Sequence, residues 1–433
     1  MIKKAMTASY LPNKIIIFIV VKIYLSHLPD NMSDSKPSLL VAKGNINRMG
    51  GAERDLIRCL PHLQQWYDVS VATLNPSQKL SNLCRENNIK IFSPPAPWNP
   101  PNSPFSQIFD GVHKSSKQHW RMCEGLIEAI DNFDYFHIVS GDGYLAIMEM
   151  IPQSKTAHLY LHEPHRGYHE DSLHRKLNGK LKRPSIVTNL ILSKGRKNDL
   201  SIVRKFASNP KFFVSGNSSY SAQRSRDVYN IECNLLHPCV DQDEYSNEVG
   251  DTTNPIKQST QAEYVVTVGT ANWAKATMET ISMLSGTGIS LAHVGGGTDA
   301  EKSQLQVHAK NNSVELWIAP KLSSSELAKL MSDALAIVSM AHKEPFGLTP
   351  IEAFSIGTPA IFVDEGGFRD TIVDGKCGRL IARDNITEWH LALVQARDPE
   401  NRKNWSKFGR DRILKLKLSP KQQAEKIHHI LQH

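Results

Sequence analysis

Two glutamates, Glu344 and Glu352, stand eight residues apart on either side of a Phe-Gly-Leu turn. The apolar run at 334–338 ahead of them predicts a buried parallel strand. The segment 350–356 predicts a helix with proline in its first turn, where the missing N–H costs nothing. The first glutamate then lies in the loop between strand and helix, and the second lies inside the helix.

Between the two glutamates, the backbone amides of Gly347, Leu348 and Thr349 would open this helix. The positive end of a helix dipole suits a diphosphate, and glycine lets a phosphate approach the backbone closely. Carboxylates accept hydrogen bonds from sugar hydroxyls, so Glu344 would hold a transferred sugar and Glu352 a ribose. The stretch therefore predicts a nucleotide-sugar site.

An isolated pair of glutamates at this spacing also fits a strand-loop-helix unit with two solvated carboxylates. Three later groups favour the site: Gly-Thr-Pro at 357–359, Gly-Gly at 366–367 and Asp-Gly at 374–375. Their order closely resembles the C-terminal half of family 4 glycosyltransferases, which are retaining enzymes of the GT-B fold.

The resemblance covers about residues 38–433 and implies an α/β protein of GT-B architecture, with two Rossmann-like, doubly wound domains facing each other across a cleft. The expected parts are an N-terminal extension at 1–37, either poorly ordered or interfacial, an acceptor domain at 38–246, a nucleotide-sugar-binding domain at 262–418 and a helix at 419–433 that crosses back to the first domain. The chain length independently allows two cores of ordinary size.

Apolar runs alternate with longer amphipathic stretches, as in parallel sheets with crossover helices. Strands are expected at 39–42, 69–72, 135–139, 156–160, 212–214 and 264–269, helices at 52–63 and 419–431, and a polar linker at 247–261.

Composition indicates a soluble globular protein, with 40% hydrophobic and 22% charged residues. The apolar run at 15–21 is bracketed by lysines and too short to cross a bilayer, and no small-residue cleavage pattern follows it. It indicates an extended or misassigned start, or a weak interfacial anchor. Six cysteines without C-x-x-C spacing favour reduced thiols in a cytosolic setting, so we expect a cytoplasmic protein, peripheral to the membrane at most.

The net charge of +8 indicates an anionic partner. Between residues 175 and 211 lie eleven lysines and arginines, with Asp199 the single acid. Such a run is usually a solvated face. The alternative is docking on an anionic membrane surface, which would suit a lipid-linked acceptor. Nothing resembles an aromatic-basic recognition module, so no nucleic acid partner is expected.

Two motifs in the first half follow predicted strands, at whose carboxyl ends open parallel sheets bind ligands. Gly50 and Gly51 open a helix. Such a pair can simply make a turn, but the resemblance places it in the cleft, facing the donor phosphates. His162 stands in a Tyr-x-His-x-Pro-x-Arg order. A lone histidine is usually structural, whereas the resemblance implies that it positions or polarises the sugar, with Arg166 a weaker candidate for an anionic group.

Two further segments of the first half resemble the family without implying chemistry. The Asn-Ser turn at 217–218 is expected to cap a helix. Cys239 replaces a proline in the segment that closes the first domain, and this departure is expected to be harmless.

In the second half, Lys275 matches one of two cations with which the family grips the donor diphosphate. Thr270 stands where the second cation, an arginine, is expected. Lys343 or Arg369 could take the missing position. Gly295 resembles a family turn that approaches the donor, although a plain tight turn fits it as well.

The resemblance thus implies a retaining glycosyltransferase (EC 2.4) that moves a sugar from a nucleotide diphosphate to a hydroxyl on a glycan or lipid-linked acceptor, in surface polysaccharide, glycolipid or other glycan synthesis. No metal or other cofactor is implied. The catalytic residues would be His162 and Glu344, and the donor-binding residues Gly50, Gly51, Lys275, Gly295, Phe346, Gly347, Leu348, Thr349 and Glu352. One alternative is a non-catalytic GT-B protein that keeps nucleotide or glycan binding, motivated by the missing arginine. Another is a nucleotide-sugar epimerase or a glycan phosphorylase on the same architecture.

Overall fold

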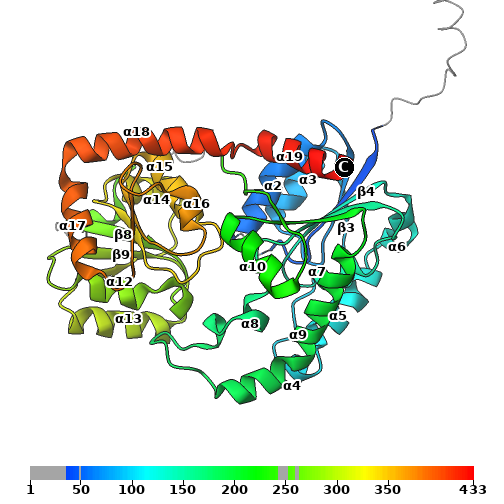
Figure 1. Cartoon of the computed structure of the whole chain (residues 1–433), viewed down its shortest axis with the longest axis horizontal. Helices are drawn as coiled ribbons and strands as arrows, with labels where there is room; N and C mark the ends of the chain where they lie inside the picture. The colour runs from blue at the N-terminus through cyan, green and yellow to red at the C-terminus, as the bar shows by residue number, and fades with distance from the viewer. Residues whose placement is uncertain (1–35, 48–49, 242–251, 259–262) are drawn as a thin grey trace, which may run out of the picture. The chain divides into compact units, whose positions relative to one another are not determined.

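The computed structural model describes residues 36–47, 50–241, 252–258 and 263–433. In the first half, short apolar runs form a parallel sheet with the strand order β3-β2-β1-β4-β5-β6-β7 (Figure 1). Its strands are β1 Ser38–Ala42, β2 Asp68–Ala72, β3 Lys90–Phe92, β4 Tyr135–Val139, β5 Thr156–Tyr160, β6 Phe212–Gly216 and β7 Asn234–Leu235. The central strands are almost wholly buried, as expected for strands covered by helices on both faces.

The second sheet is also parallel and has the order β10-β9-β8-β11-β12-β13. Its strands are β8 Tyr264–Val268, β9 Ser290–Val294, β10 Leu316–Ile318, β11 Ile337–Ser339, β12 Ala360–Val363 and β13 Arg379–Ile381. In both sheets the order reverses beside the first strand, between β1 and β4 and between β8 and β11. Doubly wound sheets bind ligands at this point, so the topology marks one candidate edge on each sheet.

Helices and short 3-10 turns connect the strands. In the first half these are α2 Gly51–Leu63, α3 Gln78–Glu86, α4 Pro104–Ile108, α5 Gly111–Arg121, α6 Leu126–Ala129, η1 Ile130–Asn132, α7 Tyr144–Met148, α8 Arg166–His169, η2 Ser172–His174, α9 Ser185–Ala207 and α10 Ser219–Tyr229. In the second half they are η3 Pro255–Gln258, η4 Trp273–Lys275, α12 Thr277–Leu284, α13 Asp299–Asn311, α14 Ser324–Ser332, α15 Leu348–Ile356, α16 Phe368–Thr371, α17 Ile386–Arg397, α18 Pro399–Leu416 and α19 Pro420–Gln432.

The last helix, α19, packs on α2 beside the first sheet (Figure 1). Ala424, Ile427 and Leu431 recur at helical spacing and join the same core as Leu39 and Val41. The end of the chain therefore stabilises the first half. The residue ranges assigned to the domains stay predictions.

Part of the expected linker at 247–261 belongs to the second core. Asn254 donates through Nδ2 to the hydroxyl of Tyr264 and to Asp333, each at 2.9 Å, and Ile256 is fully buried. A polar composition resembles a linker even when its polar groups are buried and bonded, and this concealed the packing. Residues 247–251 and 259–261 lie outside the described residues, as does the apolar run at 15–21.

Two element boundaries differ from expectation near the paired glutamates. The strand β11 begins at Ile337, three residues later than the apolar run, because the buried Ala334 and Leu335 before it lie in a bend. The helix α15 begins at Leu348, two residues before Pro350, because Gly347 provides its cap.

All six cysteines are free and buried, which confirms the expectation of unpaired thiols. No helix within the described ranges has both the length and the apolar character needed to cross a bilayer.

Candidate active site

A pocket of about 470 Å³ is lined by the segments that follow β1, β5, β6 and β7 of the first sheet and β8 and β11 of the second. Ten of the eleven predicted site residues line it: Gly50, Gly51, His162, Lys275, Glu344, Phe346, Gly347, Leu348, Thr349 and Glu352. Fold topology therefore brings together residues that are far apart in the sequence, such as Gly50 and Glu352. Their chemical roles remain predictions.

The amino end of α15 forms one wall of this pocket. Gly347 caps the helix with φ 88°, and a Cβ atom there would lie 2.5 Å from the ring of Phe368. Glycine is therefore required both by conformation and by space. The N–H groups of Leu348 and Thr349, in the first turn, have no partner within the helix and can serve an anion.

The two glycines at 366–367 pack against the loop that precedes α15. A Cβ atom at Gly366 would lie 2.4 Å from the carbonyl oxygen of Glu344, and one at Gly367 would lie 2.2 Å from that of Pro345. The Gly367 amide also donates to the Glu344 carbonyl at 2.7 Å. Close backbone packing, which only glycine allows, thus fixes the loop that carries Glu344.

Lys275 and Glu344 form an ion pair inside the pocket, with Nζ and Oε2 2.8 Å apart. Burial raises the pKa of Glu344, but the charges of Lys275 and Arg166 more than offset it, so the pKa lies below its usual value. The lysine follows β8, and Asn272 Oδ1 accepts from its backbone N–H at 3.1 Å. The carboxylate of Glu344 is therefore charged at neutral pH and is held in place by Lys275.

Glu352 is buried and paired with Arg54, whose Nη2 lies 3.3 Å from Oε1. Arg54 comes from α2 and lines the pocket, yet the sequence did not single it out. One feature of the sequence could have indicated Arg54: it lies one turn after Gly51, on the helix whose amino end was expected to face the cleft.

The two expected substitutes for the missing arginine lie elsewhere. Arg369 pairs with Asp364 at 2.6 Å, and Lys343 is exposed; neither is among the residues that line the pocket. Thr270 does line it, and the lysines and arginines of the described wall are Lys275 and Arg54.

His162 faces the pocket from the first sheet. Its Nδ1 lies 3.0 Å from Ser140 Oγ, while Nε2 is buried without a hydrogen-bond partner in the part of the chain that the structure describes. Burial, and then the charges of Lys43 and His137, hold the pKa of His162 well below its usual range, so the ring is neutral. A buried polar atom without a partner at a pocket wall is suited to a ligand.

Arg166 and Gly295 do not line the pocket. Arg166 pairs with Glu163 at 2.8 Å and donates to the backbone carbonyl of Lys343. A Cβ atom at Gly295 would lie 1.9 Å from the carbonyl oxygen of Gly269, so this glycine packs beneath a pocket-lining backbone. Its observed role is support, and direct contact with a donor stays a prediction.

The capping role expected of the Asn-Ser turn is confirmed, because Ser218 accepts from Ser221 N at 2.9 Å and caps α10. The backbone N–H of Cys239 donates to Asp55 Oδ1 at 2.6 Å. A proline could not make this bond, which gives the substitution at 239 a structural consequence. Among the described residues, no group of three or more histidine, cysteine, aspartate or glutamate side chains could hold a metal ion.

Comparison with known proteins bears on the family and on the fold. Residues 253–412 match the family described as glycosyl transferases group 1. Alpha-maltose-1-phosphate synthase of Mycobacterium tuberculosis is 27% identical over 113 residues, which cover 24% of this chain and 29% of that protein. The alignment thus spans less than a third of this curated relative.

Two solved structures share the fold over nearly their whole length. A glycosyltransferase from Rickettsia africae has a TM-score of 0.65 at 14% identity, covering 92% of this chain and 98% of that one. Anabaena HepE, solved in complex with UDP and glucose, has a TM-score of 0.62 at 14% identity, covering 92% and 99%. The predicted GT-B fold is confirmed, and the match to the glycosyl transferases group 1 family covers residues 253–412, most of the second half of the chain.

Proposed function

We propose that the protein is a retaining glycosyltransferase that moves a sugar from a nucleotide diphosphate to a hydroxyl acceptor. The observation that carries this proposal is one pocket whose wall contains a helix amino end, Lys275 and two glutamates with different partners. In the reaction, the bond from C1 of the sugar to the diphosphate oxygen breaks and the acceptor oxygen bonds to C1. The hydroxyl proton leaves with the diphosphate.

The pocket offers a separate place for each part of such a donor. Lys275 and the amides of Leu348 and Thr349 suit the diphosphate, because fixed donors and a cation stabilise the charge that develops on a leaving group. Glu352 would accept from the ribose hydroxyls. Glu344 and the free Nε2 of His162 would contact the sugar.

Uridine diphosphate sugars are the donor class we propose to test first, since HepE was solved with UDP and with UDP-glucose. A glycan or a lipid-linked hydroxyl is the proposed acceptor class. The expected cytoplasmic location belongs to the same proposal.

The deciding experiment is hydrolysis or transfer from a panel of nucleotide sugars by the whole chain, followed by NMR of the anomeric proton at early times. Turnover of one donor class with retained configuration, lost in Lys275→Ala, is expected. A suitable control is Lys403→Ala, which removes an exposed lysine of α18. Inversion of configuration would contradict the retaining chemistry.

A non-catalytic binding protein is the second candidate, because Thr270 leaves the pocket without the family's arginine. It would bind nucleotide by calorimetry yet turn over no member of the panel, with or without an acceptor extract. That outcome would replace the enzymatic proposal.

A further inference from the structure

Helix α9 has two faces of opposite character. Its buried positions, Thr188, Leu192, Gly195, Asp199, Val203 and Phe206, recur at helical spacing and face the protein. On the other side, Ile186 and Leu190 lie one turn apart and are 81% and 74% exposed. One exposed leucine is ordinary, but two large aliphatic side chains on one stripe are not explained by packing.

Neighbouring side chains enlarge this apolar surface. Val187 is also exposed on α9. The short helix α4 packs against α9, and its exposed Phe105 and the adjoining Phe109 add aromatic area. Large apolar side chains are therefore exposed both on the amino half of α9 and on the short helix that packs against α9.

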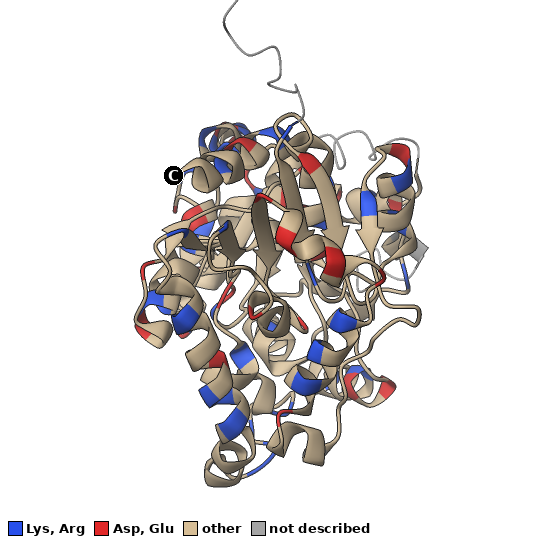
Figure 2. Cartoon of the chain, turned by 90° about the vertical axis from the view of Figure 1, so that its right-hand side faces the viewer, with Lys and Arg blue, Asp and Glu red and all other residues tan. Residues whose placement is uncertain are grey.

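Positive charge surrounds the same surface. The stretch 172–198 contains eight lysines and arginines and no acidic residue. Lys194 and Lys197 continue the stripe of Ile186 and Leu190 by steps of four and three residues, and both are exposed. Figure 2 shows lysine and arginine recurring along the helices in the lower half of its view.

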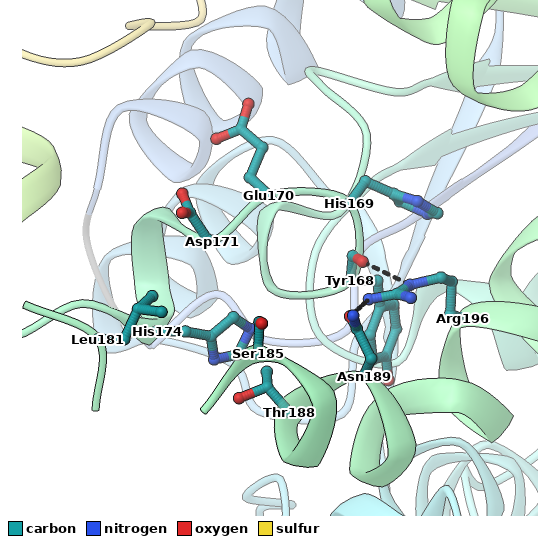
Figure 3. A pocket seen from close by; sticks show the side chains of 10 residues that line it. All are labelled: Tyr168, His169, Glu170, Asp171, His174, Leu181, Ser185, Thr188, Asn189 and Arg196. Atoms are coloured by element: carbon teal, nitrogen blue, oxygen red, sulfur yellow. Dashed lines mark hydrogen bonds between the residues drawn. The ribbon is translucent and has the colours of Figure 1, made fainter. Parts of the chain in front are cut away.

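Some basic residues of this stretch are bound to other parts of the chain, and others are exposed to solvent. Arg196 donates to the carbonyl of Tyr168 at 2.7 Å and to Asn189 at 3.2 Å, and all three residues line the pocket shown in Figure 3. Lys182 donates to the carbonyl of Leu173 at 3.1 Å, and Arg175 lies over the ring of Trp273.

Four exposed lysines make no ion pair or side-chain hydrogen bond with the described part of the chain, and these are available to a partner: Lys176, Lys180, Lys194 and Lys197.

We propose that the amino half of α9, residues 185–197, together with α4, is a docking surface for an anionic lipid bilayer. Aliphatic and aromatic side chains would enter the headgroup boundary, and the lysines would remain at the level of the lipid phosphates. Other partners fit less well. A nucleic acid offers negative charge but no apolar layer for Ile186 and Leu190, and a second copy would bring the same positive charge.

The proposal extends the proposed function, because it would place the enzyme where a lipid-linked acceptor is found, but it does not depend on donor chemistry. Vesicle binding and donor hydrolysis are separate measurements. If the parent protein hydrolyses no donor but still binds vesicles, the proposed function is contradicted and the docking surface is still supported.

Flotation of the whole chain with vesicles tests it. Phosphatidylcholine vesicles containing phosphatidylglycerol should bind the parent at low salt, and pure phosphatidylcholine vesicles should bind it at least about tenfold more weakly, since each basic residue near a charged surface adds attraction. Ile186→Ser/Leu190→Ser and Lys194→Glu/Lys197→Glu should each lower binding by about tenfold or more. All four positions are exposed, so the melting temperature should not change.

Matched controls change the same residue types elsewhere. Lys403→Glu/Lys407→Glu alters two exposed lysines on α18, and Leu414→Ser alters a leucine that is 67% exposed. Both should bind vesicles like the parent and hydrolyse soluble donor normally.

Three results would overturn the proposal. The first is no binding by the parent, or equal binding to charged and uncharged vesicles. The second is parent-like binding by both α9 variants, which would assign membrane affinity to another part of the chain, such as the apolar run at 15–21. The third is that Lys194→Glu/Lys197→Glu abolishes binding to a nucleic acid duplex while vesicle binding is unchanged.

Discussion

Glu344 and Glu352 have different partners in the folded chain although they belong to one short motif. Glu344 pairs with Lys275 of the same half, beside the positive end of α15. Glu352 lies within α15 and pairs with Arg54 of the other half. Neutralising the two carboxylates should therefore disturb different parts of a bound donor.

Glu344→Gln should leave binding of a bare nucleoside diphosphate within a few-fold of the parent, or tighten it, because Lys275 is released toward the phosphates. Glu352→Gln should weaken the same ligand by about tenfold, the cost of losing a charged hydrogen-bond acceptor at the ribose. Isothermal calorimetry with the nucleoside diphosphate measures both, with the exposed Glu128→Gln as control. The opposite order of affinities would refute the two assignments.

Arg54 and Thr270 offer a test of the phosphate charge at the same scale. A charge-assisted hydrogen bond contributes roughly 1.5 to 3 kcal/mol, so Thr270→Arg should tighten nucleoside diphosphate binding by about tenfold or more. Arg54→Met should weaken it if Arg54 supplies part of the missing charge. The double variant should then bind close to the parent.

The control for this series is Arg369→Met, because Arg369 pairs with Asp364 away from the pocket wall. If Thr270→Arg leaves the dissociation constant unchanged and Arg369→Met raises it, the diphosphate lies elsewhere.

At the scale of elements, Asp55 holds α2 in place. Its carboxylate accepts from Cys239 N at 2.6 Å and from Gln423 Nε2 at 3.1 Å, so it ties α2 to the segment after β7 and to α19. Burial raises the pKa of Asp55 from 3.8 to about 6, and the hydrogen bonds from Cys239 and Gln423 only partly offset this. The same helix presents Gly50, Gly51 and Arg54 to the pocket.

The pH dependence of stability follows from this shift. The folded state keeps the Asp55 proton up to about pH 6, whereas the unfolded chain releases it near its ordinary pKa. Between these two values the folded state binds more protons, so this group makes stability fall as pH rises, by roughly 3 kcal/mol in full.

Asp55→Asn should remove that dependence and raise the melting temperature at neutral pH. The asparagine can still accept from Cys239, and its amide can donate to Gln423 Oε1, which has no partner among the described atoms. Asp55→Ala should lower the melting temperature, because it leaves buried donors unpaired. Thermal unfolding between about pH 4 and pH 7 checks both; an asparagine variant as unstable as the alanine variant would contradict the argument.

At the scale of the whole molecule, both sheets contribute to the pocket. Ser218 and Ser221 of the first half donate to the carbonyl of Pro345, next to Glu344. Asp370 of α16 accepts from Ser219 N at 2.7 Å and pairs with His237. The loop that carries Glu344 is therefore fixed by both halves.

His162 belongs to the half opposite the proposed phosphate and ribose contacts. His162→Ala should lower turnover by about a hundredfold or more, in the range expected for a positioned imidazole, and change the nucleotide dissociation constant no more than about twofold. Because the pKa of His162 lies well below 6.5, no loss of activity near that pH should be traceable to this ring. Turnover within a few-fold of the parent would make it a structural histidine.

The sequence by itself determined the features that depend on neighbours along the chain. The strands β1, β2, β4, β5, β6 and β8, the helix at the paired glutamates and ten pocket residues follow from apolar periodicity, glycine and proline placement and the resemblance to family 4. Such patterns are local, because strand and helix periods relate residues only a few positions apart.

Only the tertiary structure decided which distant side chains meet. Arg54 and Glu352 are 298 positions apart, and Asp55 and Gln423 are 368 apart, so neither pair has a local pattern. The structure likewise separated structural from available lysines and arginines on α9, and placed Gly295 beneath the pocket rather than in its wall. Burial and pairing of this kind depend on how whole elements pack, which residue types and spacing leave open.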